Sequence, residues 1–375
     1  MTLRTSLCDL LGIEYPIVQS GMGSVAGPEL AAEVSKAGGL GILGGLLKTA
    51  DQLRDEIRRV RARTARPFGV NLWLHQELRP PVPAHSIADS TLAQAQGALN
   101  AFRARLGLPP STARPAPPPD LIAEAFEVIL DERVPVWSTV FGPPDRAMID
   151  ECHRRGIAVI AMVATPADAR TVVALGCDAV VAQGSEAGGH RATFTKPASP
   201  ETGAIGSMAL IPQIVDAVHV PVIAAGGIAD GRGLVAALAL GAAGILMGTR
   251  FVATQESTAA EAWKKSLLER DGDSTTVTDV FTGLWARALR SRFTEEYRAS
   301  GAPALPTLWQ AAAARDISAA AIQAGDPDYF PMWSGQGVGL LHSLPGAGDV
   351  VETVVREARA ALDALAGSAG KHRPD

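Results

Sequence analysis

The residues best able to do chemistry stand together in the stretch VVAQGSEAGGH, residues 180–190. An apolar run ends at Gln183, three glycines follow, and the stretch closes on His190. An imidazole exchanges protons near neutral pH, and glycines allow a ligand to approach the backbone closely. From this pattern alone, His190 is either a satisfied loop histidine or a group that takes a proton from a bound substrate or donates one to it.

Two further glycine-rich stretches, AAGGIADGRG at 224–233 and LMGTR at 246–250, indicate a phosphate site. Their backbone N–H groups and the helix N-termini that follow suit an anion without any lysine. A phosphorylated cofactor with its own reactivity fits best, and flavin mononucleotide (FMN) is the leading candidate. Pyridoxal phosphate fits less well, because no lysine stands at a strand end to form a Schiff base.

Other kinds of active site lack their sequence patterns. There is no G-x-S-x-G elbow for a hydrolase and no H-x-x-x-H or H-E-x-x-H pair for a metal, so we expect no metal ion. Cys8, Cys152 and Cys177 include no C-x-x-C pair and stand in apolar or helical contexts, which predicts buried, inert thiols. QSGMGSVAG is too loose a match to a dinucleotide-binding fingerprint to count.

The elements that must position these residues alternate regularly between strand and helix. Several of the strands are apolar on both faces, as expected for strands covered on both sides. Eight strand–helix units predict an α/β fold, a (β/α)8 TIM barrel, with a doubly wound sheet as the alternative. The predicted strands are 15–22, 40–45, 67–74, 134–142, 157–164, 178–184, 220–227 and 242–251. His190 then follows strand six, and the phosphate loops follow strands seven and eight, where such barrels carry their active sites.

Two regions fall outside this repeat. An insertion after strand three, residues 75–120, is rich in proline, which predicts an extended chain without a continuous helix. It is either a lid over the active site or a surface excursion. We assign residues 1–253 to the barrel and residues 254–375 to a mainly helical region packed over the barrel mouth.

Composition narrows the possible partners and surroundings. The 375 residues carry a net charge of -5 without a basic block, so we expect no nucleic-acid partner. No apolar run approaches the length of about 20 residues that spans a bilayer. The sparse cysteines and the absence of a signal-peptide pattern predict a cytoplasmic protein without a membrane partner.

In several places the chain resembles the nitronate monooxygenase family, formerly called 2-nitropropane dioxygenases. The matching stretches are PIVQSGMG, GVNLW, AQGSEAGGHR, PVIAAGGIADGRG and GILMGTRF, in this order and at successive strand ends. The resemblance implies oxidation of alkyl nitronates by dioxygen to a carbonyl compound and nitrite, with FMN as the cofactor. It also implies a flavin semiquinone mechanism. The expected partners are the small-molecule nitronate and dioxygen, and a homodimer is possible.

The resemblance also implies roles for individual residues. His190 matches the active-site histidine of the family. The residues expected to hold FMN are Met22, Gly23, Asn71, Gln183, Gly188, Gly226, Gly227, Gly248 and Thr249. Glu186 either orients His190 or faces solvent. Arg191 and Arg250 are candidates to contact an anionic substrate or the phosphate, and a surface role is the alternative for Arg191.

Two other functions remain open from the sequence. A similar EAGGH signature occurs in flavin reductases that use NADH or NADPH, namely an FMN-dependent enoyl-acyl-carrier-protein reductase and a quinone reductase. A flavin-binding protein with little turnover is the third possibility. The placed histidine at a strand end favours an enzyme.

Overall fold

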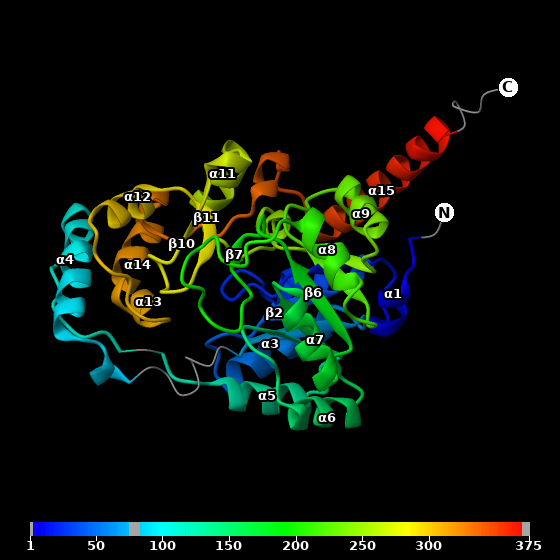
Figure 1. The fold of residues 1–375 in the computed structure, drawn as a ribbon, viewed down its shortest axis with the longest axis horizontal. Helices are drawn as coiled ribbons and strands as arrows, with labels where there is room; N and C mark the ends of the chain where they lie inside the picture. Colours follow the sequence, from blue (N-terminus) through cyan, green and yellow to red (C-terminus); the bar gives the residue numbers. More distant parts are fainter. Residues whose placement is uncertain (1–2, 75–82, 117, 370–375) are drawn as a thin grey trace.

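Eight parallel strands form the centre of the protein, with helices around them (Figure 1). The computed structural model describes residues 3–74, 83–116 and 118–369. The sheet order is β1-β9-β8-β6-β5-β4-β3-β2, and a parallel bridge between Val18 and Leu40 joins its two ends. The strands are β1 (Ile17–Gln19), β2 (Gly41–Gly44), β3 (Phe68–Trp73), β4 (Val136–Val140), β5 (Ala158–Val163), β6 (Ala179–Gln183), β8 (Val222–Ala225) and β9 (Gly244–Met247). The predicted (β/α)8 barrel is confirmed.

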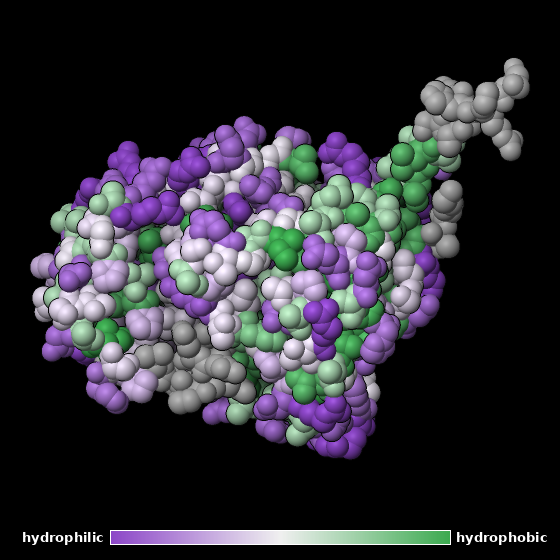
Figure 2. All heavy atoms as spheres, viewed as in Figure 1, coloured by the Kyte–Doolittle hydropathy of each residue, from purple (hydrophilic) through white to green (hydrophobic). Residues whose placement is uncertain are grey.

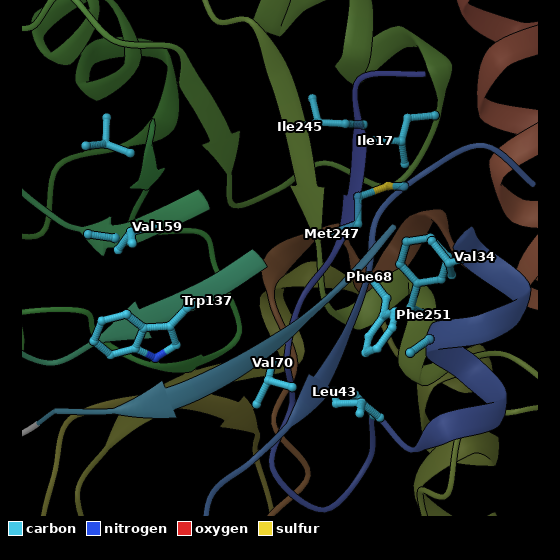
Figure 3. Close-up of a cluster of buried hydrophobic side chains, with 14 of the residues drawn as sticks. Ile17, Val34, Leu43, Phe68, Val70, Trp137, Val159, Ile245, Met247 and Phe251 are labelled. Atoms are coloured by element: carbon cyan, nitrogen blue, oxygen red, sulfur yellow. The ribbon is translucent and has the colours of Figure 1, made fainter. Parts of the chain in front are cut away.

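Side chains on both faces of the barrel wall are buried, because successive residues of a strand point to opposite sides. Val18 and Leu246 belong to the cluster inside the barrel, which also contains side chains of α1 (Ser6–Leu11). Their neighbours Ile17 and Ile245 pack with Phe251 in the cluster between the strands and the helices (Figure 3). This two-sided burial explains why the strands read as continuous apolar runs.

The helices that alternate with the strands begin at caps visible in the sequence. Thr49 accepts a hydrogen bond from the Gln52 N–H at 3.3 Å, and Thr165 accepts one from the Asp168 N–H at 3.1 Å. Threonine is a favoured residue at this position, and each of the two satisfies an N–H that the first helical turn leaves unpaired. The helices are α2 (Pro28–Lys36), α3 (Ala50–Arg63), α5 (Ile122–Asp131), α6 (Arg146–Arg154), α7 (Pro166–Leu175), α8 (Ser207–Val215) and α9 (Gly231–Ala239).

The last helix, α15 (Ala347–Ala369), completes this ring of helices. It packs against α9 on one side and α2 on the other, and Val351 and Ala358 join the same cluster as the barrel strands. We expected the whole region after residue 253 to lie over the barrel mouth, and α15 does not. Its apolar stripe needs a partner, and the gap between α9 and α2 supplies one.

The insertion after β3 contains α4 (Asp89–Arg105), so the prediction that it holds no continuous helix is wrong. Its prolines flank residues 84–108 without interrupting them, and a proline blocks a helix only where it stands. α4 packs against the region after the barrel, where α12 (Arg292–Ala299) and α14 (Arg315–Ala324) lie beside it (Figure 1). The buried Arg103 of α4 pairs with Asp316 of α14 at 2.7 Å. Residues 75–82 and 117, part of the segment considered as a lid, lie outside the described residues.

Residues between β9 and α15 form a second layer at the C-terminal ends of the barrel strands. This region is not purely helical, because β10 (Thr275–Thr278) and β11 (Ala286–Leu289) form an antiparallel sheet with β7 (Gly189–His190). β7 belongs to the loop after β6, so the sheet joins this region to the barrel. The other elements are α10 (Thr249–Val252), α11 (Glu261–Glu269), α12 (Arg292–Ala299), α13 (Trp309–Ala313) and α14 (Arg315–Ala324).

Figures 1 and 2 show α15 projecting from the rest of the protein, with apolar residues along its exposed end. Leu365 on this end is 60% exposed. Within the described ranges, no helix combines the length and apolar character needed to cross a bilayer.

Two of the cysteines are expected to resist thiol reagents in the folded protein. Burial raises the pKa of Cys152 to about 12, and that of Cys177 also to about 12, so almost no thiolate forms at pH 8. Iodoacetamide at pH 8 should therefore modify neither residue until guanidinium unfolds the chain, as read by peptide mass spectrometry. A Met208→Cys variant supplies a reactive control, because Met208 is 72% exposed. Rapid native modification of Cys152 or Cys177 would contradict this expectation.

Candidate active site

A cavity of about 770 Å³ opens at the C-terminal ends of the barrel strands. Its walls come from the loops after β1, β6, β8 and β9, from β3 and β4, and from the region after the barrel. The structure brings all ten residues predicted from the sequence to this cavity: Met22, Gly23, Asn71, Gln183, Gly188, His190, Gly226, Gly227, Gly248 and Thr249. Its size is typical of a site for a cofactor or small ligand.

Gln183 holds the loop after β6 in place. Its side-chain Nε2 donates to the backbone oxygen of His190 at 2.8 Å, and its Oε1 accepts from the Ala192 N–H at 2.8 Å. Both ends of its amide bind the backbone around His190, and its expected contact with the edge of a flavin stays a prediction. Gln183 therefore positions the histidine.

His190 lies among aromatic rings at the cavity wall. The centre of its ring is 4.9 Å from that of Trp73, 4.8 Å from Trp333 and 6.0 Å from Phe141. Its Nε2 is 2.8 Å from the hydroxyl oxygen of Thr282, in the turn between β10 and β11. This contact fixes the ring's orientation and gives one ring nitrogen a proton-sharing partner.

The loops after β8 and β9 present unused backbone donors to the cavity. Among the described residues, no acceptor takes a hydrogen bond from the backbone N–H groups of Gly226, Gly227, Gly248 or Thr249. Gly226 has φ +109, which a residue with a Cβ rarely adopts. Four free N–H groups at glycine-rich turns are the donor set that a phosphate requires, so these residues fit a phosphorylated cofactor.

Close backbone packing joins the loop after β6 to the region after the barrel. A Cβ added at Gly188 would lie 2.5 Å from the backbone nitrogen of Gly335, so only glycine fits there. The Gly335 N–H in turn donates to the Thr249 hydroxyl at 2.9 Å. These contacts hold three segments together at one corner of the cavity: the loop after β6, the start of α10 after β9, and the segment before α15.

Three charged residues near the cavity have structural partners. The carboxylate of Glu186 accepts from the Ser207 N–H and hydroxyl at 2.9 Å, so it neither orients His190 nor simply faces solvent. Arg250 donates to the carbonyls of Ala253 and Ser343, and burial lowers its pKa. Arg191 donates to the Gln183 carbonyl at 3.1 Å.

Asn71, which is buried in β3, also has a partner within the protein. Its side-chain amide donates to the Ser138 hydroxyl of β4 at 3.0 Å.

Sequence reasoning missed several residues around His190. Trp73 stands in GVNLW, one of the stretches that resemble the family, but no role was assigned to it, and Trp333 lies outside those stretches. Thr282 carried no signal, since it stands in another part of the chain and reaches His190 only through the β7–β11 pairing. No group of potential metal ligands is present within the described ranges.

Comparison with known proteins identifies the family. The family model described as nitronate monooxygenase matches residues 4–357. The chain belongs to the nitronate monooxygenase family. A probable nitronate monooxygenase of Staphylococcus aureus strain JH9 is 36% identical, over 94% of this chain and 97% of that protein. This family membership makes the protein an oxidoreductase enzyme and a flavoprotein.

Solved structures with similar folds cover almost the whole chain. The nitroalkane oxidase from Streptomyces ansochromogenes is 37% identical, with a TM-score of 0.86, over 96% of this chain and 100% of that chain. FabK from Thermotoga maritima is 33% identical, with a TM-score of 0.76, over 98% of this chain and 100% of that chain. The nitronate monooxygenase fold therefore extends over the barrel and the region after it.

Proposed function

We propose that this nitronate monooxygenase homologue uses FMN to oxidise alkyl nitronates with dioxygen, giving a carbonyl compound and nitrite. The observation that carries the proposal is that His190 and four unused backbone donors line the same cavity. Gly226, Gly227, Gly248 and Thr249 would hold the phosphate of FMN. Met22, Gly23, Asn71 and Gly188 would lie along its ring. When bound, the flavin supplies electron transfer and the reaction with dioxygen.

The protein's own part in this reaction is binding and proton transfer. Trp73, Phe141 and Trp333 surround the imidazole with apolar surface, which suits an alkyl chain and excludes water. His190 would donate a hydrogen bond to a nitronate oxygen, or take the α-proton from a neutral nitroalkane. Gln183 and Thr282 keep the ring in place for either role.

The second candidate is an NADH- or NADPH-dependent flavin reductase, and the observation that favours it is the EAGGH signature at residues 186–190. Anaerobic mixing distinguishes the two functions. A visible flavin spectrum, bleached by propionate 3-nitronate and unaffected by NADH or NADPH, supports nitronate oxidation. Fast bleaching by NADH or NADPH supports the reductase. A protein that shows no flavin spectrum even after FMN is added would contradict both.

Thr282→Val is expected to reduce turnover while the flavin stays bound. Valine keeps the shape of threonine and removes the hydroxyl that shares a proton with His190, so kcat/KM should fall about 5- to 30-fold. We expect Thr282→Ser to restore most of the activity, and the pH profile of Thr282→Val to shift. Thr171→Val, on the exposed surface of α7, is the matched control. If Thr282→Val keeps the activity and the pH profile of the unmodified protein, the Thr282 hydroxyl does not support His190 in catalysis.

A further inference from the structure

A second cavity, of about 760 Å³, lies on the other side of the β10-β11-β7 sheet from the His190 ring. Side chains alternate along β7, so Gly189 and Arg191 face away from the side on which His190 lies. Arg287 pairs with Gly189 across the sheet and faces this second cavity with Arg191. The sheet thus separates the proposed flavin cavity from a cavity lined by arginines.

The protein balances the positive charge in this arginine cavity only in part, through Glu186, whose negative charge acts on both Arg191 and Arg287. Arg191, Arg287 and Arg298 line it, and within the described residues none of them has a carboxylate oxygen within 4.0 Å. They donate instead to neutral oxygens: Arg287 to the Ser185 carbonyl at 2.9 Å and Arg298 to the Val277 carbonyl at 3.1 Å. Glu201 is the carboxylate among the lining residues, and it is exposed.

Arg103 is an example of a buried arginine that a carboxylate of the same chain neutralises directly. Arg103, whose side chain is 2% exposed, has Asp316 at 2.7 Å. Burial lowers the pKa of Arg191, and the nearby Arg287 lowers it further. Both guanidinium groups nevertheless stay charged at neutral pH, because an arginine pKa lies far above 7. Partly buried like charges without a carboxylate in direct contact are unfavourable, and a bound anion would relieve them.

We propose that the arginine cavity binds the phosphoryl group of a small organic molecule. A guanidinium group can donate two parallel hydrogen bonds to phosphate oxygens, and the Thr202 and Ser199 side chains add hydroxyls to the same wall. Pro197 and Trp285 provide an apolar wall for the organic part of the ligand. The volume suits a molecule larger than nitrite or phosphate alone.

An anion in this cavity would act on the active-site histidine. Gln183, Ala187 and Gly189 line both cavities, and a Cβ at Gly189 would meet nothing within 4 Å, so the wall is thin there. Arg191 donates to the backbone carbonyl of Gln183, and the Gln183 side chain holds the backbone of His190. Drawing Arg191 toward an anion therefore changes the support of His190.

Isothermal titration calorimetry tests the proposal. Inorganic pyrophosphate is titrated into the flavin-loaded protein at low salt. Arg298→Gln, on the exposed face of α12, should weaken binding about 10- to 100-fold because it removes a charge-assisted contact. Arg191→Gln should do the same. Arg290→Gln, also exposed but outside the cavity lining, should leave binding unchanged. If Arg191→Gln fails to fold, Arg298→Gln alone still tests the site.

Two results would overturn the arginine cavity as an anion site. One is no heat of binding at millimolar pyrophosphate, and the other is equal weakening in Arg298→Gln and Arg290→Gln. The source of the phosphoryl group is identified by a second titration. Binding of NADPH that depends on Arg298 indicates a nicotinamide dinucleotide, whereas pyrophosphate binding without NADPH binding indicates another phosphorylated metabolite. Neither titration requires nitronate turnover, so the site is tested separately from the proposed function.

Discussion

Replacing His190 with alanine is expected to lower kcat/KM for a neutral nitroalkane by about 10²- to 10⁴-fold, the usual contribution of a positioned acid or base. The flavin should remain bound, because the proposed phosphate donors are backbone groups of other loops. The preformed nitronate has already lost its α-proton, so its oxidation should fall less. Comparing kcat/KM for the two substrates separates removal of the α-proton from the hydrogen bond to a nitronate oxygen. The flavin absorbance of each preparation shows whether the cofactor is bound.

His219→Asn is the matched control for this experiment, because His219 is exposed and precedes β8 at the opposite end of the barrel. It should leave both activities unchanged. His190→Asn keeps a polar group of similar size and guards against collapse of the aromatic cluster. If His190→Ala and His190→Asn both oxidise nitroalkane and nitronate at the normal rate, His190 is not the proton-transferring residue.

Gly226→Ala is expected to weaken flavin binding. The backbone at Gly226 has φ +109, and a Cβ there would lie 3.0 Å from the Ser207 hydroxyl and 3.1 Å from the Ala187 nitrogen. A left-handed backbone costs a residue with a Cβ about 1–2 kcal/mol, and the crowding adds to it. The loop must then move, and we expect the Kd for FMN to rise at least about 10-fold. Fluorescence titration of the flavin-free protein with FMN measures the change.

Gly156→Ala separates backbone strain from damage to the cavity. Gly156 has φ +72, but a Cβ there would meet nothing within 4 Å, and it lies at the other end of the barrel, before β5. This variant should lose some thermal stability and keep its affinity for FMN. Equal FMN affinity in Gly226→Ala and the unmodified protein would show that the loop after β8 does not hold the phosphate.

The barrel was predictable because its signals are local. An apolar run such as 157–164 and a cap such as Thr165 each depend on a few neighbouring residues, and the structure confirms both. The alternation of eight such units then determines which strand ends meet at the active-site end. For this reason the ten predicted site residues line one cavity, although they are spread from Met22 to Thr249.

The features that sequence reasoning missed depend on contacts between distant parts of the chain. β7 has only two residues, too few for any periodic pattern, and it exists because β11 pairs with it. Thr282 reaches His190 through this pairing. The apolar stripe of α15 predicted a helix, but a stripe does not reveal which surface it will cover. In α4, flanking prolines hid a helix whose Arg103 and Phe102 face partners after the barrel.

The position of α15 also determines when the protein can finish folding during synthesis. α2 ends at Lys36 and leaves the ribosome long before its neighbour α15, which begins at Ala347. Until α15 emerges, α2 and α9 expose the apolar surfaces that it later covers, and contacts across so much sequence form slowly. Between the synthesis of α2 and that of α15, the ring of helices around the barrel of the nascent chain therefore stays incomplete. Chaperones would protect the chain from aggregation in this state.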